Sequence, residues 1–164
     1  MKFTILLSPD DIRQGVAFSS KKRLFESIAA FVVEKLQCEN GEQACFECLF
    51  EREKLGNSGL GNGVAMPKAK LPVTVSDKIL TVFMQLETPV EYDAADNKPV
   101  DIIFAVLVPE NHCQEYIPVL AELNEKLTDK NLIKQLRSAQ SADEIWQVFE
   151  ISDRAESSPE ETQE

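Results

Sequence analysis

The chain has 164 residues, enough for one domain with a substantial hydrophobic core and too few for two comfortable ones. Hydrophobic residues make up 43% and charged residues 27%, as in an ordinary soluble globular protein, and the net charge of −11 argues against nucleic-acid binding because such a surface repels phosphate backbones. No apolar run approaches the ~20 residues that cross a bilayer, and the N-terminal MKFTILLSPDD lacks the pattern of a signal peptide, so we expect a cytoplasmic protein without membrane insertion.

The first half of the chain predicts one short strand and two helices. Residues 12–18 can form the strand, and Ser19 or Ser20 then offers an N-cap for a helix over KKRLFESIAAFVVEKL. The apolar residues of this helix recur at helical spacing and predict a stripe that faces the core: Leu24, Ile28, Phe31, Val32 and Leu36. A second helix is expected over residues 42–55, ended by Gly56.

The second half of the chain predicts two strands followed by helices. Residues 79–86, ILTVFMQL, are rich in β-branched and aromatic side chains, and residues 100–108, VDIIFAVLV, form a nearly continuous apolar run, as expected of a strand buried on both faces. Helical patterns follow, the last of them behind a capping box at residues 141–144. The pattern implies one layered α/β domain over residues 1–151, and we expect the acidic segment 152–164 to be a disordered tail.

The cysteines include a CxxC motif, Cys45 and Cys48, which is the spacing of many zinc and redox sites. The surrounding sequence has the composition of a helix, which would place both thiols on one face. A structural zinc site usually needs two such pairs, and Cys38, His112 and Cys113 do not complete a second one with a usual spacing. We therefore expect buried free thiols, no metal and no cofactor, with a metal or redox function as the alternative.

A connection dense in glycine follows the second predicted helix; its glycines are Gly56, Gly59, Gly61 and Gly63. The Walker pattern requires a lysine where Asn62 stands, and the dinucleotide-binding pattern requires a glycine where Met66 stands. Nucleotide binding is therefore weakly supported. A turn-rich connection with positive φ angles is the simpler interpretation, and close approach of another molecule is the alternative.

The stretch LFEREKLGNSGLGNGVAMPKAKL closely resembles the core motif of the nitrogen-related enzyme IIA proteins of the bacterial phosphoenolpyruvate phosphotransferase system. The match runs from Arg52 to Pro67, continues in VFMQLETPVEYDAADNKPVDIIFAVLVPE, and covers roughly residues 12–150. The resemblance implies a mixed β-sheet flanked by helices on both faces. It also implies protein partners such as a phosphocarrier protein, a sensor kinase or a potassium-transport regulator.

The chain departs from this family's pattern at the phosphoacceptor. The family's phosphorylated histidine directly follows the proline, and here Lys68 follows Pro67. A second family histidine lies near the start of the helix after the Val-Pro turn, and the alignment places Tyr116 at about that position. His112 is the only histidine of the chain, and it matches no motif position.

Lysine changes the chemistry that this position can perform. A neutral imidazole, with a pKa of ~6.5, can accept a phosphoryl group near neutral pH, whereas an unperturbed lysine, with a pKa of ~10.4, is almost entirely an ammonium without a free lone pair. We therefore expect no catalytic acceptor. Burial can lower a lysine pKa by several units, and for this reason phosphorylation of Lys68, or of His112 in its place, stays open as an alternative.

The same loop predicts an anion site. We expect Arg52, Ser58, Asn62 and Lys68 to bind a phosphate, sulfate or carboxylate together with backbone N–H groups of the glycine-rich loop. In the alternative, Glu51, Glu53 or an acid of the 91–96 loop neutralises Lys68 internally.

Three functions follow from these residues. The first is a regulatory protein, not an enzyme, that resembles a nitrogen-branch IIA domain and acts by protein contact without accepting phosphate. The second is an active phosphoryl carrier whose acceptor is His112 or Lys68, and the third is a small-anion sensor at Arg52 and Lys68. The substitution at Lys68 favours the first.

Overall fold

The computed structural model describes residues 1–37 and 41–162, with side chains described as far as Glu156. Its elements follow in this order along the chain: α1 (Phe3–Leu6), η1 (Pro9–Asp11), β1 (Ile12–Val16), α2 (Lys21–Leu36), α3 (Glu42–Leu55), β2 (Gly59–Gly61), β3 (Val64–Ala65), β4 (Lys68–Leu71), β5 (Leu80–Val90), β6 (Val100–Pro109), η2 (Glu110–His112), α4 (Cys113–Leu127), α5 (Lys130–Ser138) and α6 (Ala142–Thr162). No helix in these ranges is long and apolar enough to cross a membrane.

The strands form one mixed sheet in the order β1-β5-β6-β3-β2, and β4 also pairs with β6. Strands β5 and β6 are antiparallel, whereas β1 runs parallel to β5, and β3 and β4 run parallel to β6. Along β6, Val64 of β3 pairs with Ile102, and Lys68 of β4 pairs with Val106. The β4 pairing therefore places Lys68 beside the C-terminal part of β6, the strand that leads through η2 into α4.

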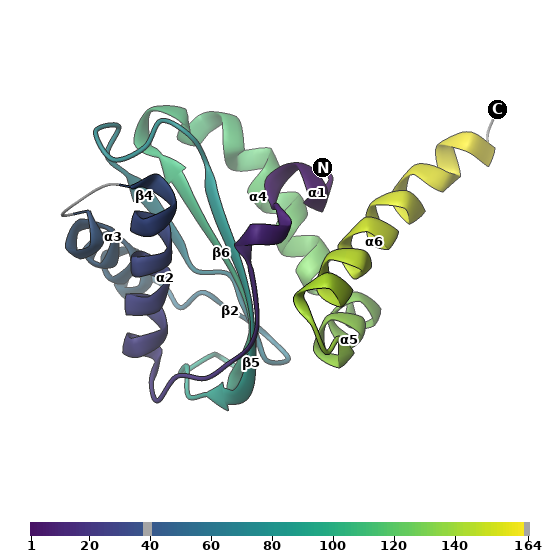
Figure 1. The fold of residues 1–164 in the computed structure, drawn as a ribbon, viewed down its shortest axis with the longest axis horizontal. Coiled ribbons are helices and arrows are strands. Elements are labelled where there is room, and N and C mark those ends of the chain that lie inside the picture. Colours follow the sequence, from purple (N-terminus) through teal and green to yellow (C-terminus); the bar gives the residue numbers. More distant parts are fainter. Residues whose placement is uncertain (38–40, 163–164) are drawn as a thin grey trace.

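Helices cover both faces of this sheet (Figure 1). Helices α2 and α3 pack on one face, and α1, α4, α5 and α6 contribute to the core on the other. Side chains of β6 alternate between the two cores: Ile103, Ala105 and Leu107 join the first, and Ile102, Phe104, Val106 and Val108 join the second. The expected mixed sheet flanked by helices on both faces is confirmed.

The predicted bounds of helices α2 and α3 agree with the structure, whereas the predicted end of strand β5 is too early. Helix α2 begins after Ser20, whose hydroxyl accepts from the Arg23 N–H, and α3 spans Glu42–Leu55 as expected. Strand β5 continues past residue 86 to Val90, which pairs with Val100. Pro89 lies within the register shift between Gln85 and Val90, where the ladder does not need a proline N–H.

Helix α6 does not end at Ile151, where the sequence suggests that a disordered tail begins; it continues to Thr162. The Asp153 side chain is buried, and its carboxylate accepts hydrogen bonds from the Phe3 N–H, the Thr4 N–H and the Thr4 hydroxyl. These partners are far away in sequence, which is why local composition gives no sign of them. The beginning of the predicted tail therefore packs on the domain and anchors α1.

Candidate functional site

A cavity of about 730 Å³ opens between α3 and α4, beside β4. Three cationic side chains line it, Arg52 from α3 and Lys68 and Lys70 from β4, together with the carboxylate of Glu51. Its apolar wall includes Leu55, Ile117 and Leu120. The predicted pairing of Arg52 with Lys68 in one pocket is therefore present in the fold, because the parallel β4–β6 register brings Lys68 to the gap between these helices.

Lys68 is half-buried at the start of β4. Its position is fixed by backbone bonding, since the carbonyl of Pro67 accepts from the Val106 N–H at 2.9 Å. Burial lowers the pKa of the Lys68 amine, and the nearby Arg52 guanidinium lowers it further, while the Glu53 carboxylate acts in the opposite direction. Within the described part of the chain, no hydrogen-bond or ion-pair partner satisfies this amine.

Arg52 is held at the end of the helix that carries it. Its Nη1 donates to the carbonyl oxygen of Gly56 at 3.1 Å, where the last carbonyls of α3 lack helical partners. A guanidinium has further N–H donors, so this single bond leaves most of its hydrogen-bonding capacity for a ligand.

No carboxylate of the described residues forms an ion pair with Lys68, although Glu51 lines the same cavity and Glu53 acts on the Lys68 pKa from nearby. The Glu53 carboxylate instead binds Lys21 at 3.0 Å and accepts from the Ser58 N–H at 2.7 Å and the Ser58 hydroxyl at 3.1 Å. The same hydroxyl lies 2.6 Å from the Tyr92 hydroxyl, and burial raises the Tyr92 pKa. Ser58 therefore belongs to a closed buried network and does not line the cavity with Lys68.

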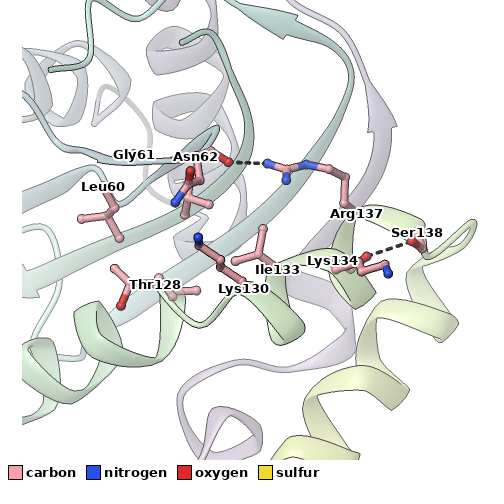
Figure 2. A pocket seen from close by; sticks show the side chains of 11 residues that line it. Leu60, Gly61, Asn62, Thr128, Lys130, Ile133, Lys134, Arg137 and Ser138 are labelled. Carbon is pink, nitrogen blue, oxygen red and sulfur yellow. Dashed lines mark hydrogen bonds between the residues drawn. The ribbon is translucent and has the colours of Figure 1, made fainter. Parts of the chain in front are cut away.

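Asn62 also lies away from Lys68. Asn62 and Gly63 both have positive φ angles, 56° and 81°, which suits the tight turn between β2 and β3 for which Asn-Gly is favoured. The Asn62 N–H donates to Asp96 at 2.9 Å, and its carbonyl accepts from Arg137 at 2.8 Å. Figure 2 shows this turn beside α5, over a separate cavity of about 360 Å³ that Lys130 also lines.

The glycine-rich segment is thus mainly a β-hairpin. Its N–H groups at Ser58, Gly59, Asn62 and Met66 have partners within the protein. The four residues predicted to bind an anion are divided: the fold brings Arg52 and Lys68 together, and it places Ser58 and Asn62 elsewhere.

Neither His112, the alternative phosphoacceptor, nor Tyr116, at the position of the family's second histidine, lines the Lys68 cavity. His112 lies in η2 with its Nδ1 3.0 Å from a Glu115 carboxylate oxygen, and Tyr116 packs against the core of the α4–α6 face. The α4 residues that do line the cavity include Cys113, Gln114 and Ile117. Sequence reasoning missed them, although their helical spacing, which continues to Leu120, could have indicated a shared face.

The two CxxC thiols have different surroundings although they are i,i+3 neighbours on α3. Cys45 is buried in the core, which raises its pKa to about 12, and Cys48 lines the Lys68 cavity, where burial and then Glu51 raise its pKa. The described residues contain no group of three or more His, Cys, Asp or Glu side chains that could hold a metal ion. Cys38 lies outside the described residues.

Comparison with known protein families matches residues 5–151 to the family described as phosphoenolpyruvate-dependent sugar phosphotransferase system, EIIA 2. A nitrogen regulatory protein homologue from Haemophilus influenzae is 74% identical over 164 residues, which is the full length of both chains.

Solved structures show the same likeness. The crystal structure of nitrogen regulatory protein IIA-Ntr from Neisseria meningitidis has a TM-score of 0.80 and 36% identity, and the match covers 88% of this chain and 97% of that one. The mannitol enzyme IIA from Escherichia coli, solved in a complex with phosphorylated mannitol enzyme IIB, has a TM-score of 0.68 and 22% identity over 87% of this chain and 96% of that one, and so shares the fold.

Proposed function

The chain belongs to the EIIA 2 family of the phosphoenolpyruvate-dependent phosphotransferase system, as a nitrogen-regulatory IIA-like protein, and we propose that it regulates protein partners by contact without accepting phosphate. The observation that carries this proposal is Lys68, whose amine occupies the position directly after Pro67 in the cavity between α3 and α4. The ammonium form of Lys68 has no lone pair for a phosphoryl group, so only the neutral fraction of this amine could accept one, and the relay experiment below measures whether it does.

The same cavity supports contact with a phosphorylated protein. A protein that shares the fold, the mannitol enzyme IIA, has been solved in complex with phosphorylated mannitol enzyme IIB. In this chain three cations, Arg52, Lys68 and Lys70, line a cavity with an apolar wall, which suits a partner that brings a phosphoryl group on an apolar surface. Candidate partners are a phosphocarrier protein, a sensor kinase or a potassium-transport regulator, in the cytoplasm.

The direct test mixes the purified chain with the complete phosphorelay and phosphoenolpyruvate and measures protein-bound phosphate by intact mass. We expect none on the wild-type chain, while the phosphocarrier protein in the same tube becomes phosphorylated. A stoichiometric, acid-labile phosphate that passes on to an acceptor molecule would overturn the proposal. Mapping that phosphate to His112 or Lys68 would establish the alternative of a displaced acceptor.

The Lys68→His variant asks how much of the transfer chemistry remains in the fold. We expect phosphorylation that is at most partial, because the position assigned to the second histidine holds Tyr116, which packs against the core and does not line the cavity, so it cannot orient the new imidazole. Transfer at the rate of a relative that has both histidines would contradict this expectation.

Anion binding is the second candidate function, and the unpartnered Lys68 amine beside Arg52 favours it. Titration with phosphate, acetyl phosphate or citrate, read by thermal unfolding, measures it. A ligand at 100-fold excess over its Kd adds ~2.7 kcal/mol of stability. An Arg52→Gln variant that keeps the full shift would exclude this cavity as the site.

A further inference from the structure

We propose that Lys68 captures small 2-oxo acids reversibly as a Schiff base, with the Arg52 guanidinium holding the carboxylate. This inference uses the same cavity as the proposed function and rests on it in one respect: an amine that carries no phosphoryl group is available for other chemistry. It assigns to the cavity a ligand class with two features, an anionic group and an electrophilic carbonyl carbon.

The surroundings of Lys68 are those that make a lysine nucleophilic. Its side chain is half-buried, its amine has no bonded partner in the described structure, and the cavity beside it has the apolar side chains Leu55, Ile117 and Leu120 in its wall. Removal from water disfavours the ammonium, and so does a second cation close by. Both effects lower the pKa of Lys68 and raise the fraction of neutral amine at neutral pH.

Arg52 supplies the second point of attachment. One of its nitrogens is bonded to the Gly56 carbonyl, and the other donors of the planar guanidinium can bind a carboxylate in two parallel hydrogen bonds. The cavity volume of about 730 Å³ lies within the range typical of small-molecule sites. Because Arg52 and Lys68 line the same cavity, a carboxylate bound to Arg52 keeps the adjacent carbonyl carbon in the cavity that holds the Lys68 amine.

The chemical step is balanced without an oxidant or reductant. The lone pair of the neutral Lys68 Nζ forms a bond to the carbonyl carbon while the π bond of the C=O group breaks toward oxygen. One of the two amine protons moves to that oxygen, which gives a carbinolamine. Loss of that oxygen as water, with the second nitrogen proton, leaves a C=N bond between Nζ and the former carbonyl carbon. The reverse reaction with water releases the 2-oxo acid, so the capture is an equilibrium that follows ligand concentration.

Lys70 provides a matched internal control. It lies two residues further along β4 and lines the same cavity, but its side chain is exposed. Chemistry that depends only on the presence of a lysine would occur at both positions, whereas chemistry that depends on burial beside Arg52 would select Lys68.

The test is reductive trapping with pyruvate as the probe. The full chain is incubated with pyruvate and cyanoborohydride at neutral pH, and the adduct is counted by intact mass and mapped by peptide mass spectrometry. We expect one adduct per chain at Lys68, loss of that adduct in Lys68→Arg and in Lys68→Gln, and an unchanged adduct in Lys70→Arg. Thermal unfolding of each variant checks that it is folded.

Propionaldehyde, which has the carbonyl without the carboxylate, tests the part played by Arg52. We expect Arg52→Gln to lower the trapping of pyruvate more than the trapping of propionaldehyde, because only pyruvate has a carboxylate that the Arg52 guanidinium can bind. Equal uptake by wild type and both Lys68 variants, adducts spread evenly over surface lysines including Lys70, or an unchanged ratio of the two probes in Arg52→Gln would each overturn the proposal. Phosphate mapped to His112 in the relay experiment would remove the proposed function but not this capture, phosphate mapped to Lys68 would remove both, and absence of trapping would remove the capture alone.

Discussion

The carboxylate of Asp153 holds the first helix of the chain onto the last one, and its replacement by alanine is the sharpest test of the fold. Helix α1 has no side-chain cap of its own, and the Phe3 and Thr4 N–H groups donate to Asp153 at 2.9 and 3.0 Å. The Thr4 hydroxyl adds a third bond at 2.8 Å. Alanine removes both acceptor oxygens, and with them all three hydrogen bonds, at once.

The loss of stability in Asp153→Ala depends on whether each donor can form a hydrogen bond to water once the carboxylate is gone. The Phe3 N–H is buried and would remain without a partner, which costs about 1–3 kcal/mol, whereas the two Thr4 donors are partly buried and regain some bonding to water. We therefore expect Asp153→Ala to lower the free energy of unfolding by about 2–4 kcal/mol, or roughly 4–16 °C in Tm for a chain of this size. Asp153→Asn keeps one acceptor and should lose about half as much.

Urea unfolding followed by circular dichroism measures these differences. Glu156→Gln is the control on the same helix: it removes the partner of Lys126, 2.6 Å away in a partly exposed pair, and should cost less than ~1 kcal/mol. A chain ended after Ile151 should lose at least as much stability as Asp153→Ala. If Asp153→Ala instead stays within about 0.5 kcal/mol of wild type, the anchoring of α1 by α6 contributes nothing and this reasoning is refuted.

Three further predictions concern single residues. Lys68→Met should be more stable than wild type at neutral pH, because the folded pKa of Lys68 lies below its unfolded value. Between these two pKa values the unfolded wild-type chain binds more protons than the folded one, so the stability of the wild type rises with pH there. Urea titrations at several pH values should therefore show the stability difference between Lys68→Met and wild type shrinking as the pH approaches ~10.4. Cys45, with a pKa of about 12, should resist thiol reagents at pH ~8 until the chain unfolds, and rapid labelling of the folded chain would contradict its burial. Gly63→Ala should cost about 1–3 kcal/mol in urea unfolding, because its φ is +81° and a Cβ would lie 2.6 Å from Arg137 and 3.0 Å from Asp101; an unchanged midpoint would show that the hairpin relaxes freely.

The sequence predicts the long elements well because local periodicity determines them. Helix α2 has an apolar stripe at helical spacing, α3 has a helical composition followed by Gly56, and β6 is an apolar run of strand length rich in β-branched side chains. The short strands around the glycine-rich loop were not predicted, since β3 has two residues and β4 has four, and they depend on pairing with β6. Such pairings are set by residues distant in the chain, which local propensity does not record.

The candidate site was predicted in part for the same reason. The family motif led to Arg52 and Lys68, and the fold places them in one cavity. Proximity along the chain suggested Ser58 and Asn62 as well, but Glu53 and Tyr92 engage the first, and the hairpin turn carries the second toward α5. The contribution of α4 required knowledge of how β6 leads into that helix.

The alternation of β6 side chains between the two cores has a consequence for the chain as a whole. Removal of α2 and α3 from the sheet would expose Ile103, Ala105 and Leu107 of β6 to water. Removal of α4, α5 and α6 from the other face would expose the β6 side chains between them, which include Phe104 and Val106. The sheet with the helices of only one face would therefore not be stable as a separate subdomain. A proteolytic nick between them should give fragments that are unstable apart and regain structure only when mixed.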